Sequence, residues 1–254
     1  MGFLTGKTAI ITGAGRAILK DGSCGSIGYG IATAYAKEGA NLVITGRNVK
    51  KLEAAKQELE SLYGIKVLTV QADVCAGGDN EATVANVVKQ AVDTFGGIQV
   101  LINNAQASAS GVPLAEHTTE QFDLAIYSGL YAAFYYMKAC YPYLAESHGS
   151  VINFASGAGL FGNFGQSAYA AAKEGIRGMS RVAATEWGKA STSTWSARWH
   201  GRPSSSSSGT PTPTLSRPTS RCPPWATTAT LRRRLAVSAS SWPCRILSIC
   251  PARL

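Results

Sequence analysis

Three side chains near the middle of the chain have the types and spacing of an acid–base site. Tyr169 and Lys173 lie four residues apart in SAYAAAKEG, so a helix there places both on one face. The nearby ammonium favours the phenolate form of the tyrosine, which makes the phenol usable as a general acid and base. Ser156, at the end of an apolar run, could hold a substrate oxygen beside the phenol. Taken alone, a Tyr–Lys pair is more often a surface contact.

A second group of residues has the composition of a phosphate-binding turn. The stretch TGAGRAILKDGSCGSIGYGIA places Gly13, Gly15, Gly25 and Gly28 between a β-rich run and a helical one. Glycines allow a tight turn and close approach of the backbone to a pyrophosphate, while the start of the helix supplies free N–H groups. This position favours nucleotide binding over a merely structural turn. An insert near AILKDGSC stretches the usual glycine spacing, and the sequence does not explain its role.

Two arginines bear on the choice of nucleotide. The second strand ends at ITGRN, where an acidic residue would bind the ribose 2′-hydroxyl of NAD. Arg47 stands there instead, and Arg16 lies in the glycine loop. Two guanidiniums suit a 2′-phosphate, so this pattern favours NADP(H) over NAD(H). The alternative is a pair of solvated surface arginines.

The elements that position these residues alternate between strand and helix patterns. Short β-rich runs and longer stretches of helical periodicity follow one another in turn. This alternation predicts βαβ units, and therefore an α/β fold with a Rossmann-like doubly wound parallel sheet and helices on both faces. Ligands of such sheets bind at the carboxyl ends of the strands. The expected strands are 7–12, 41–47, 66–74, 98–105 and 149–156, and the expected helices are 27–40, 49–64, 80–97, 118–147 and 167–189.

Together, the glycine loop, ADV, NNA, the serine thirteen residues before the tyrosine and Tyr-x-x-x-Lys resemble the short-chain dehydrogenase/reductase family over residues 5 to 189. The resemblance implies that Tyr169 exchanges a proton with an alcohol or carbonyl oxygen, which Ser156 orients. It also implies that Lys173 favours the phenolate and holds the nicotinamide ribose. The cofactor-binding residues implied in this way are Gly13, Gly15, Arg16, Ser26, Ile27, Gly28, Arg47, Asp73, Val74, Asn103, Ala105, Tyr169 and Lys173.

Within that family, NNAQASASG, AIYSGLYAAFYYMKACYP and FASGAGLFGNFGQSAYAAAKEGIRG resemble the bacterial NADP-dependent 12α-hydroxysteroid dehydrogenases. This resemblance implies a steroid substrate, with the 12α-hydroxyl of bile acids as the reacting group. Two positions depart from the wider family: NNAG ends here in Gln106, and a helical Asn assigned to a proton relay aligns with Gly129. A similarity of SIGYGIA to enoyl reductases is opposed by the three-residue Tyr–Lys gap, which favours alcohol/ketone chemistry.

The composition changes abruptly near residue 190. Residues 1–190 are formally neutral, whereas 191–254 contain nine Arg, eight of the ten Pro and no Asp, Glu or Lys. The whole net charge of +9 therefore belongs to the tail, and the high pI gives no sign of a basic patch on the body. We expect a dinucleotide-binding catalytic domain at 1–190 and a separate Arg/Ser/Pro-rich tail at 191–254.

Three explanations of the tail compete: a basic arm that binds nucleic acid, a poorly packed extra segment, or a shifted reading frame. Back-translation with one base shifted at Ala190 gives a strand followed by a Cys-Pro turn similar to that of the family, and the chain's end also becomes family-like. The shifted frame is the favoured explanation. Taken literally, the Ser/Pro runs predict disorder, so the chain is expected to lack the sixth and seventh strands and to be weakly active.

The remaining sequence features narrow the class of protein. No signal-peptide pattern or long apolar run is present, which predicts a cytoplasmic protein without membrane association. Cys24, Cys75 and Cys140 lack metal-ligand spacing, so no metal site is expected. The expected partners are a small-molecule substrate and a second copy of the chain, a homo-tetramer if the C-terminus is intact, with no nucleic acid. The rival functions are a carbonyl reductase of another small substrate and a cofactor-binding protein without turnover.

Overall fold

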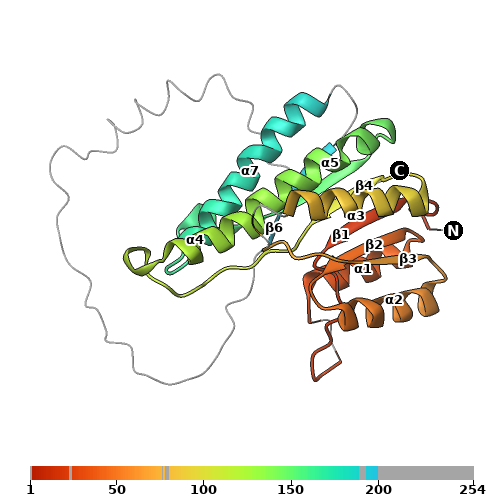
Figure 1. The fold of residues 1–254 in the computed structure, drawn as a ribbon, viewed down its shortest axis with the longest axis horizontal. Coiled ribbons are helices and arrows are strands. Elements are labelled where there is room, and N and C mark those ends of the chain that lie inside the picture. Colours follow the sequence, from red (N-terminus) through yellow and green to blue (C-terminus); the bar gives the residue numbers. More distant parts are fainter. Residues whose placement is uncertain (1, 23–24, 76, 78–79, 189–192, 200–254) are drawn as a thin grey trace, which may run out of the picture. The chain divides into compact units, whose positions relative to one another are not determined.

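Six parallel strands form one sheet in the order β3-β2-β1-β4-β5-β6 (Figure 1). The structure is a computed structural model that describes residues 2–22, 25–75, 77, 80–188 and 193–199. Every pairing in the sheet is parallel, so all strands end at the same edge. The strands are β1 (Thr8–Thr12), β2 (Asn41–Gly46), β3 (Val67–Gln71), β4 (Val100–Asn103), β5 (Ser150–Ser156) and β6 (Ser193–Trp199).

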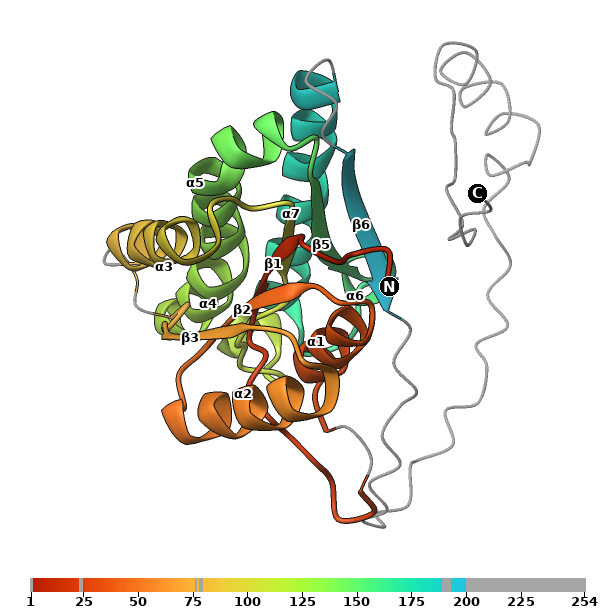
Figure 2. The same cartoon turned by 90° about the vertical axis from the view of Figure 1, so that its right-hand side faces the viewer.

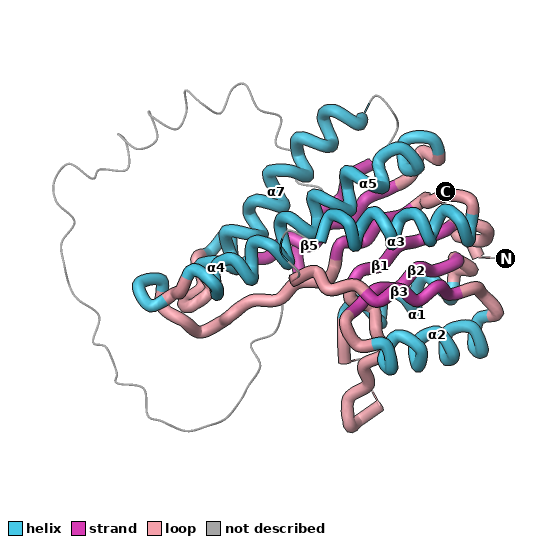
Figure 3. Tube along the Cα trace, viewed as in Figure 1, coloured by secondary structure: helices cyan, strands magenta, loops and turns pink. Residues whose placement is uncertain are grey.

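The helices connect successive strands and lie on both faces of the sheet (Figures 1 and 3). The strand order reverses beside β1, which pairs with β2 on one side and with β4 on the other. This reversal opens a crevice beyond the ends of β1 and β4. The helices are α1 (Ile27–Lys37), α2 (Val49–Tyr63), α3 (Asn80–Phe95), η2 (Leu114–Glu116), α4 (Thr119–Ala125), η3 (Ile126–Tyr131), α5 (Ala132–Glu146), α6 (Gly157–Phe161) and α7 (Ser167–Trp187).

Two apolar layers pack against the two faces of the sheet. Adjacent residues of one strand point to opposite faces, so Ile10 joins the layer under α3, α5 and α7, while Ile11 joins the layer under α1 and α2. Strands buried on both faces read as continuous apolar runs rather than as alternating ones, as TAIIT does. The predicted doubly wound fold is therefore confirmed.

Helix caps begin several of these helices at the expected residues. The Ser26 side chain accepts a hydrogen bond from the Tyr29 N–H at the start of α1, and Asn48 accepts one from the Lys51 N–H at the start of α2. Caps of this kind contribute about 1 kcal/mol each. Because Ser26 and Asn48 follow β1 and β2 respectively, they fix where the chain turns back from the sheet edge that carries the site.

The expectation that the chain lacks a sixth strand is wrong. Residues Ser193–Trp199, which lie within the predicted tail, pair in parallel with β5 along its whole length, from Ser150 to Ser156 (Figure 2). Parallel pairing uses main-chain N–H and C=O groups, which every residue of this proline-free segment supplies. Thr and Trp, which favour strands, are frequent in it. The expected disorder of the rest of the tail and its missing seventh strand lie outside the described residues.

The long helix expected over 118–147 is instead divided into three parts. Between α4 and α5, the chain makes the π-helical turn η3, which contains Ser128 and Gly129, both buried. The Ser128 hydroxyl lies 2.6 Å from the Leu124 carbonyl oxygen and accepts a hydrogen bond from the Ala107 N–H at 3.0 Å. Single π-turns within helices often occur at functional sites. Here the turn faces the segment that follows β4.

Candidate active site

Tyr169 and Lys173 lie side by side near the start of α7. The Lys173 Nζ is 5.5 Å from the centre of the Tyr169 ring and donates a 2.8 Å hydrogen bond to the Phe154 carbonyl oxygen in β5. Burial lowers the pKa of Lys173 to about 8, because the charged form loses its hydration. Tyr169 is the third residue of α7, one helical turn before Lys173. The arrangement suits proton transfer at the phenol oxygen.

Ser156 ends β5 two residues after Phe154, on the strand that anchors Lys173. Its hydroxyl accepts a 3.2 Å hydrogen bond from the Ala158 N–H and thereby caps α6. Its carbonyl oxygen accepts a 3.3 Å hydrogen bond from Arg177 Nη2, on the same helix as Tyr169. The end of β5 and the first half of α7 are therefore joined at two points. The structure thus places Tyr169 beside Lys173, and Ser156 at the end of the strand to which Lys173 is hydrogen-bonded.

A buried chain of polar side chains joins the cofactor side of the sheet to the catalytic helix. Asn103 Nδ2 donates to Asn153 Oδ1 at 2.8 Å, and Asn153 Nδ2 donates to the Ser180 hydroxyl on α7 at 2.8 Å. The Ser180 hydroxyl donates in turn to the Ile176 carbonyl oxygen at 2.7 Å. Buried polar groups with partners fix one arrangement of the elements that carry them. This chain holds β4, β5 and α7 in register.

Thr12, the last residue of β1, organises the segment after β4. Its hydroxyl accepts hydrogen bonds from the backbone N–H groups of Asn104 and Ala105, both at 2.9 Å. The Asn104 side-chain amide donates to the Thr12 carbonyl oxygen at 2.8 Å. These bonds join the end of β1 to the segment after β4 at the base of the crevice. The NNA motif is thus held by the strand that leads into the glycine loop.

The glycine loop passes too close to its neighbours for larger residues. A Cβ atom at Gly28 would overlap the Gly13 carbonyl oxygen and lie 2.6 Å from Asn104 Nδ2. Gly13 itself has a φ of +70°, a conformation that glycine adopts without strain. These two glycines therefore bring the start of α1 against the end of β1. That packing places free helical N–H groups at the crevice.

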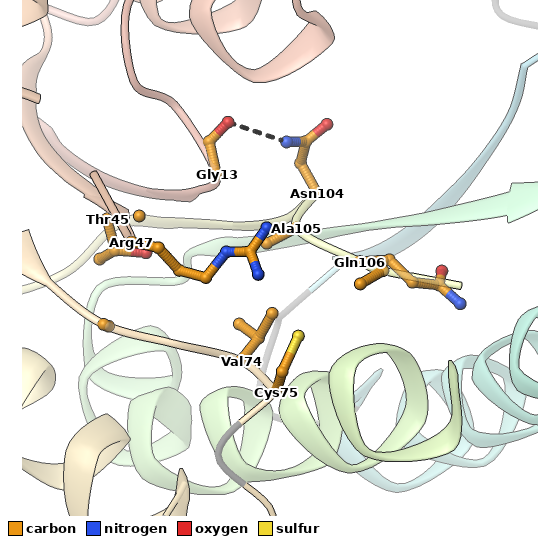
Figure 4. A pocket seen from close by; sticks show the side chains of 11 residues that line it. Gly13, Thr45, Arg47, Val74, Cys75, Asn104, Ala105 and Gln106 are labelled. Atoms are coloured by element: carbon orange, nitrogen blue, oxygen red, sulfur yellow. Dashed lines mark hydrogen bonds between the residues drawn. The ribbon is translucent and has the colours of Figure 1, made fainter. Parts of the chain in front are cut away.

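A cavity of about 230 Å³ lies at this crevice, beyond the ends of β1, β2, β3 and β4 (Figure 4). Figure 4 shows the Arg47 side chain extending along the cavity, while Gln106 lies at its far end. Thr45 and the charged residue Arg47 both line the cavity. The lining residues are Gly13, Thr45, Gly46, Arg47, Ala72, Val74, Cys75, Asn104, Ala105, Gln106 and Ala107.

The predicted cofactor residues do not all lie at this cavity. Gly13, Arg47, Val74 and Ala105 line it. Arg16 is instead paired through its Nε with Glu58 on α2, and its backbone N–H donates to the Lys51 carbonyl oxygen at 2.8 Å. That pairing lowers the pKa of the Glu58 carboxyl, to which the Tyr29 hydroxyl also donates. Of the two arginines, Arg47 lines the cavity and Arg16 is paired with Glu58.

Four further predicted residues have structural partners. The Asp73 carboxylate accepts a hydrogen bond from the Cys75 N–H at 2.9 Å and is exposed beside the cavity. Asn103 faces the buried chain described above, so its neighbour Asn104 lines the cavity in its place. Ser26 caps α1, and Gly15 packs beside Lys51, where a Cβ would lie 3.1 Å from the lysine Cβ.

Sequence reasoning missed several residues of the site. Thr12 gave no signal beyond its place at the end of a predicted strand, although parallel strands end where ligands bind. Cys75 and Thr45 follow the same rule, since each lies at or just beyond a strand end at the crevice. Gln106 was noted only as a departure from NNAG. The positions of strand ends therefore contained more information than the motifs alone.

The residues of the crevice fit a dinucleotide. The start of α1 packs so closely on Gly13 and Asn104 that its first turn lies at the crevice, where helical N–H groups can face a pyrophosphate. The cavity continues past Arg47 and Val74, where an adenosine ribose and base can lie. In the part of the chain that the structure describes, no cluster of His, Cys, Asp or Glu could hold a metal ion. Each helix described is too short or too polar to cross a membrane.

The fold and the site together define an oxidoreductase class, and comparison with known proteins agrees. The chain matches the short chain dehydrogenase family over residues 7–193 and belongs to that family. The match ends where the Arg/Ser/Pro-rich composition begins.

Individual relatives are consistent with this assignment. The chain is 67% identical to a 12α-hydroxysteroid dehydrogenase of Clostridium sp. over 189 residues, which cover 74% of this chain and 70% of that protein. A metagenomic short-chain oxidoreductase in complex with NADP has a TM-score of 0.68 at 28% identity, covering 77% of this chain and 82% of the other. An NAD⁺-bound xylitol dehydrogenase has a TM-score of 0.68 at 26% identity, covering 79% and 73%. The structural neighbours therefore include one protein bound to NADP and one bound to NAD⁺.

Proposed function

We propose that this protein transfers a hydride between NADP(H) and a hydroxyl or ketone of a steroid, with the 12α-hydroxyl of bile acids as the reacting group. The observation that carries the proposal is the position of Lys173, beside the Tyr169 ring and hydrogen-bonded to β5 two residues before Ser156. The choice of substrate rests on the 67% identity to the Clostridium 12α-hydroxysteroid dehydrogenase.

The residues act on protons and charge at the substrate oxygen. During alcohol oxidation, the Tyr169 phenolate accepts the hydroxyl proton, and the Ser156 hydroxyl donates a hydrogen bond to the same oxygen. The Lys173 ammonium stabilises the phenolate before and during this transfer. In ketone reduction, the Tyr169 hydroxyl returns the proton. NADP(H), when bound, supplies or accepts the hydride.

The side chain of Arg47 supports NADP(H) over NAD(H). It lines the cavity at the end of β2, where an acidic residue would otherwise bind the ribose 2′-hydroxyl. A guanidinium there matches a 2′-phosphate in charge and geometry. Arg16 is paired with Glu58, which offsets part of its charge. Gly13, Gly15, Ser26, Ile27 and Gly28 would surround the pyrophosphate, and Asp73, Val74, Asn103 and Ala105 the nucleoside parts.

The segment between Ser156 and Tyr169 supports an apolar substrate. It contains three large apolar side chains that are exposed, namely Leu160, Phe161 and Phe164. The segment that follows β4 is joined to it by a 2.8 Å hydrogen bond from the Gly111 N–H to the Gly165 carbonyl oxygen. Exposed apolar groups next to a catalytic hydroxyl can cover the hydrocarbon face of a steroid.

Replacing Tyr169 by Phe tests the proposed chemistry. Turnover of a 12α-hydroxy bile acid with NADP⁺ should fall at least about a thousandfold, because the variant lacks the group that accepts the proton. This loss is on the order of the combined contributions of general base catalysis and of substrate orientation. NADPH binding, measured by quenching of its fluorescence, should be retained, because the phenyl ring keeps the shape of the side chain. Turnover by Tyr169→Phe equal to that of the parent would contradict the proposal. Activity of the parent on other ketones but not on bile acids would favour the rival carbonyl reductase.

Self-association and location are further parts of the proposal. The outer surface of α5 and α7 exposes Phe134 and Val182 beside a groove that also contains Met179 and Trp187. A second copy of the chain could cover such a surface, which supports a homo-oligomer, a tetramer where the C-terminal part is intact. Light scattering after size-exclusion chromatography, with Val182→Glu as the disrupting variant, tests this. The free thiols Cys75 and Cys140 support a reducing, cytoplasmic setting.

A further inference from the structure

The last residues of β5 extend past the end of the neighbouring strand. β4 pairs with β5 only as far as Asn153, three residues before Ser156. Beyond that point, the Phe154 carbonyl oxygen accepts a hydrogen bond from Lys173. The Ser156 carbonyl oxygen accepts one from Arg177, four residues further along α7. The proposed proton transfer uses Lys173 and Ser156, whereas Arg177, which binds the main chain of one of them, has no part in it so far.

The guanidinium of Arg177 is held by two partners. Its Nη2 donates to the Ser156 carbonyl oxygen at 3.3 Å, and its Nε lies 3.2 Å from Oε1 and 3.1 Å from Oε2 of Glu174. The Arg177 side chain is only 12% exposed, so this ion pair is better shielded than a solvated surface contact. A planar guanidinium with partners on two of its nitrogens has little freedom to turn. The end of β5 is therefore bound to a fixed donor.

Gly159 makes room for the carboxylate that holds this guanidinium. A Cβ at Gly159 would overlap Glu174 Oε1 and lie 2.8 Å from Glu174 Cγ. The Glu174 side chain therefore packs directly on α6, the short helix that the Ser156 hydroxyl caps. Arg177 binds the carbonyl oxygen of Ser156, and Glu174 contacts the helix that begins at its hydroxyl. One ion pair thus supports the main chain on both sides of Ser156.

The direction of the Ser156 hydroxyl depends on this main chain. The Ala158 N–H donates to the hydroxyl oxygen at 3.2 Å, which uses a lone pair and leaves the hydroxyl proton available for a substrate oxygen. The carbonyl group and the side chain of one residue are attached to the same Cα, so a rotation of the Ser156 main chain would also turn its hydroxyl. A hydrogen bond that fixes the carbonyl oxygen therefore limits where the hydroxyl can point.

We propose that Arg177 is a positioning residue, whose guanidinium, held by Glu174, fixes the Ser156 main chain and with it the direction of the Ser156 hydroxyl. The role rests on the proposed function, in which that hydroxyl stabilises the substrate oxygen. Without Arg177 the hydroxyl is still present, but its direction is less well defined. A misplacement of about 1 Å at a reacting group can cost on the order of 100-fold in rate. Arg177 therefore acts on turnover only through Ser156.

A double-mutant cycle with Ser156 tests this dependence. Arg177→Met removes every donor of the side chain and should lower kcat about tenfold with KM for NADP⁺ unchanged, because only the placement of one hydroxyl is lost. In a Ser156→Ala background, the same change should lower kcat by less than about twofold, since no hydroxyl is left to position. Arg181→Met, at an exposed arginine one turn further along α7, is the matched control and should leave kcat unchanged. Equal losses from Arg177→Met in both backgrounds would overturn the proposal.

Gly159→Ala reaches the same ion pair from α6. The added methyl group would displace the Glu174 carboxylate from Arg177, so kcat should fall roughly threefold, again only while Ser156 is present. Gly178→Ala, where no neighbouring atom lies within 4 Å of the added Cβ, is the matched control on α7 and should leave kcat unchanged. A kcat of Gly159→Ala equal to that of Gly178→Ala would contradict the support that Glu174 gives to Arg177.

Hydrogen exchange provides a readout that does not need turnover. The Ala158 N–H donates to the Ser156 hydroxyl, so its exchange with solvent reports how firmly that hydroxyl is held. In the cofactor-free protein, Arg177→Met should speed exchange of the Ala158 amide about tenfold, the change expected when one hydrogen bond no longer supports the local structure. Arg181→Met should leave it unchanged. Equal exchange in the parent and Arg177→Met would overturn the proposal, whereas an inactive parent protein would contradict the proposed function and leave this test in force.

Discussion

The Lys173 ammonium donates its hydrogen bond to the Phe154 carbonyl oxygen at 2.8 Å, which joins the first third of α7 to β5. This contact fixes the charge next to the Tyr169 ring without using a carboxylate. A carboxylate partner would hold the ammonium more tightly but would also oppose a phenolate, since two negative groups would then share one cation. The carbonyl oxygen positions the lysine and leaves its charge available to the tyrosine.

This buried lysine should make stability depend on alkaline pH. Its pKa is about 8 in the folded protein and near 10.5 in the unfolded chain, so unfolding takes up a proton between these values. The free energy of unfolding should therefore rise with pH from about 8 to 10.5, by on the order of 3 kcal/mol at most, relative to Lys173→Met. Urea unfolding of both proteins in steps of pH measures the difference. A difference that is constant over this range would show that Lys173 is not desolvated.

Ser156→Ala should affect both activity and structure. Loss of the hydroxyl that stabilises the substrate oxygen is expected to lower kcat roughly 100-fold. Loss of the cap on α6 should cost about 1 kcal/mol of stability. Ser156→Thr keeps the hydroxyl and serves as the control for both effects. Steady-state kinetics and thermal unfolding separate them, and full activity of the alanine variant would remove Ser156 from the mechanism.

Arg47→Asp should reverse the cofactor preference. The carboxylate repels a 2′-phosphate and can accept a hydrogen bond from a ribose 2′-hydroxyl, so KM for NADP⁺ should rise about 100-fold while that for NAD⁺ falls. Arg16→Ala, at the arginine paired with Glu58, should change KM for NADP⁺ by less than about fivefold. If the two variants behave alike, the arginines share the phosphate equally and the pairing of Arg16 with Glu58 does not persist on binding.

Two glycine substitutions should have opposite effects on stability. Gly28→Ala places a Cβ against the Gly13 carbonyl oxygen, so the variant is expected to lose NADPH binding and several degrees of Tm. Gly178→Ala, within α7, meets no neighbouring atom within 4 Å and should stabilise the helix by about 0.5–1 kcal/mol. Differential scanning calorimetry and NADPH titration compare them. A stable, NADPH-binding Gly28→Ala variant would contradict the close approach at the crevice.

The tail provides a prediction at the level of the gene. If one base has shifted the reading frame near Ala190, restoring the frame should raise NADPH-dependent turnover at least tenfold and increase Tm, because the end of the chain would regain family-like sequence. Assays of the 254-residue chain beside the frame-restored chain make the comparison. Equal turnover would refute the frame-shift explanation. Affinity for DNA that falls steeply with salt and disappears on deleting 191–254 would favour the basic arm instead.

Much of this fold could be predicted because its signals are local. A strand such as TAIIT, or a helix start such as Ser26 or Asn48, can be recognised from a few consecutive residues. The division of the 118–147 helix could not be predicted, because a π-turn changes the apolar period by only one residue. It depends on the contact of Ser128 with Ala107, two positions far apart in the sequence.

The site shows the same limit. Spacing and strand ends are enough to predict Tyr169, Lys173 and Ser156 as catalytic residues. The ion-pair partner of an arginine depends instead on which carboxylate the fold brings close to it. Arg16 pairs with Glu58 because α2 passes the glycine loop, which no motif records. Likewise, Gln106 and Gly129 each look like an isolated departure, and only the structure shows that the Gln106 amide occupies the space beside Gly129.

The pairing of Ser193–Trp199 with β5 has a consequence for how such chains change over time. A parallel sheet border recognises direction and main-chain spacing, not the identity of side chains. A protein of this architecture can therefore acquire an entirely new ending and still extend its sheet by one strand, provided that the first few residues after α7 are free of proline. New C-terminal sequences can then arise by mutation while the residues of the candidate active site, which precede them in the chain, stay in place.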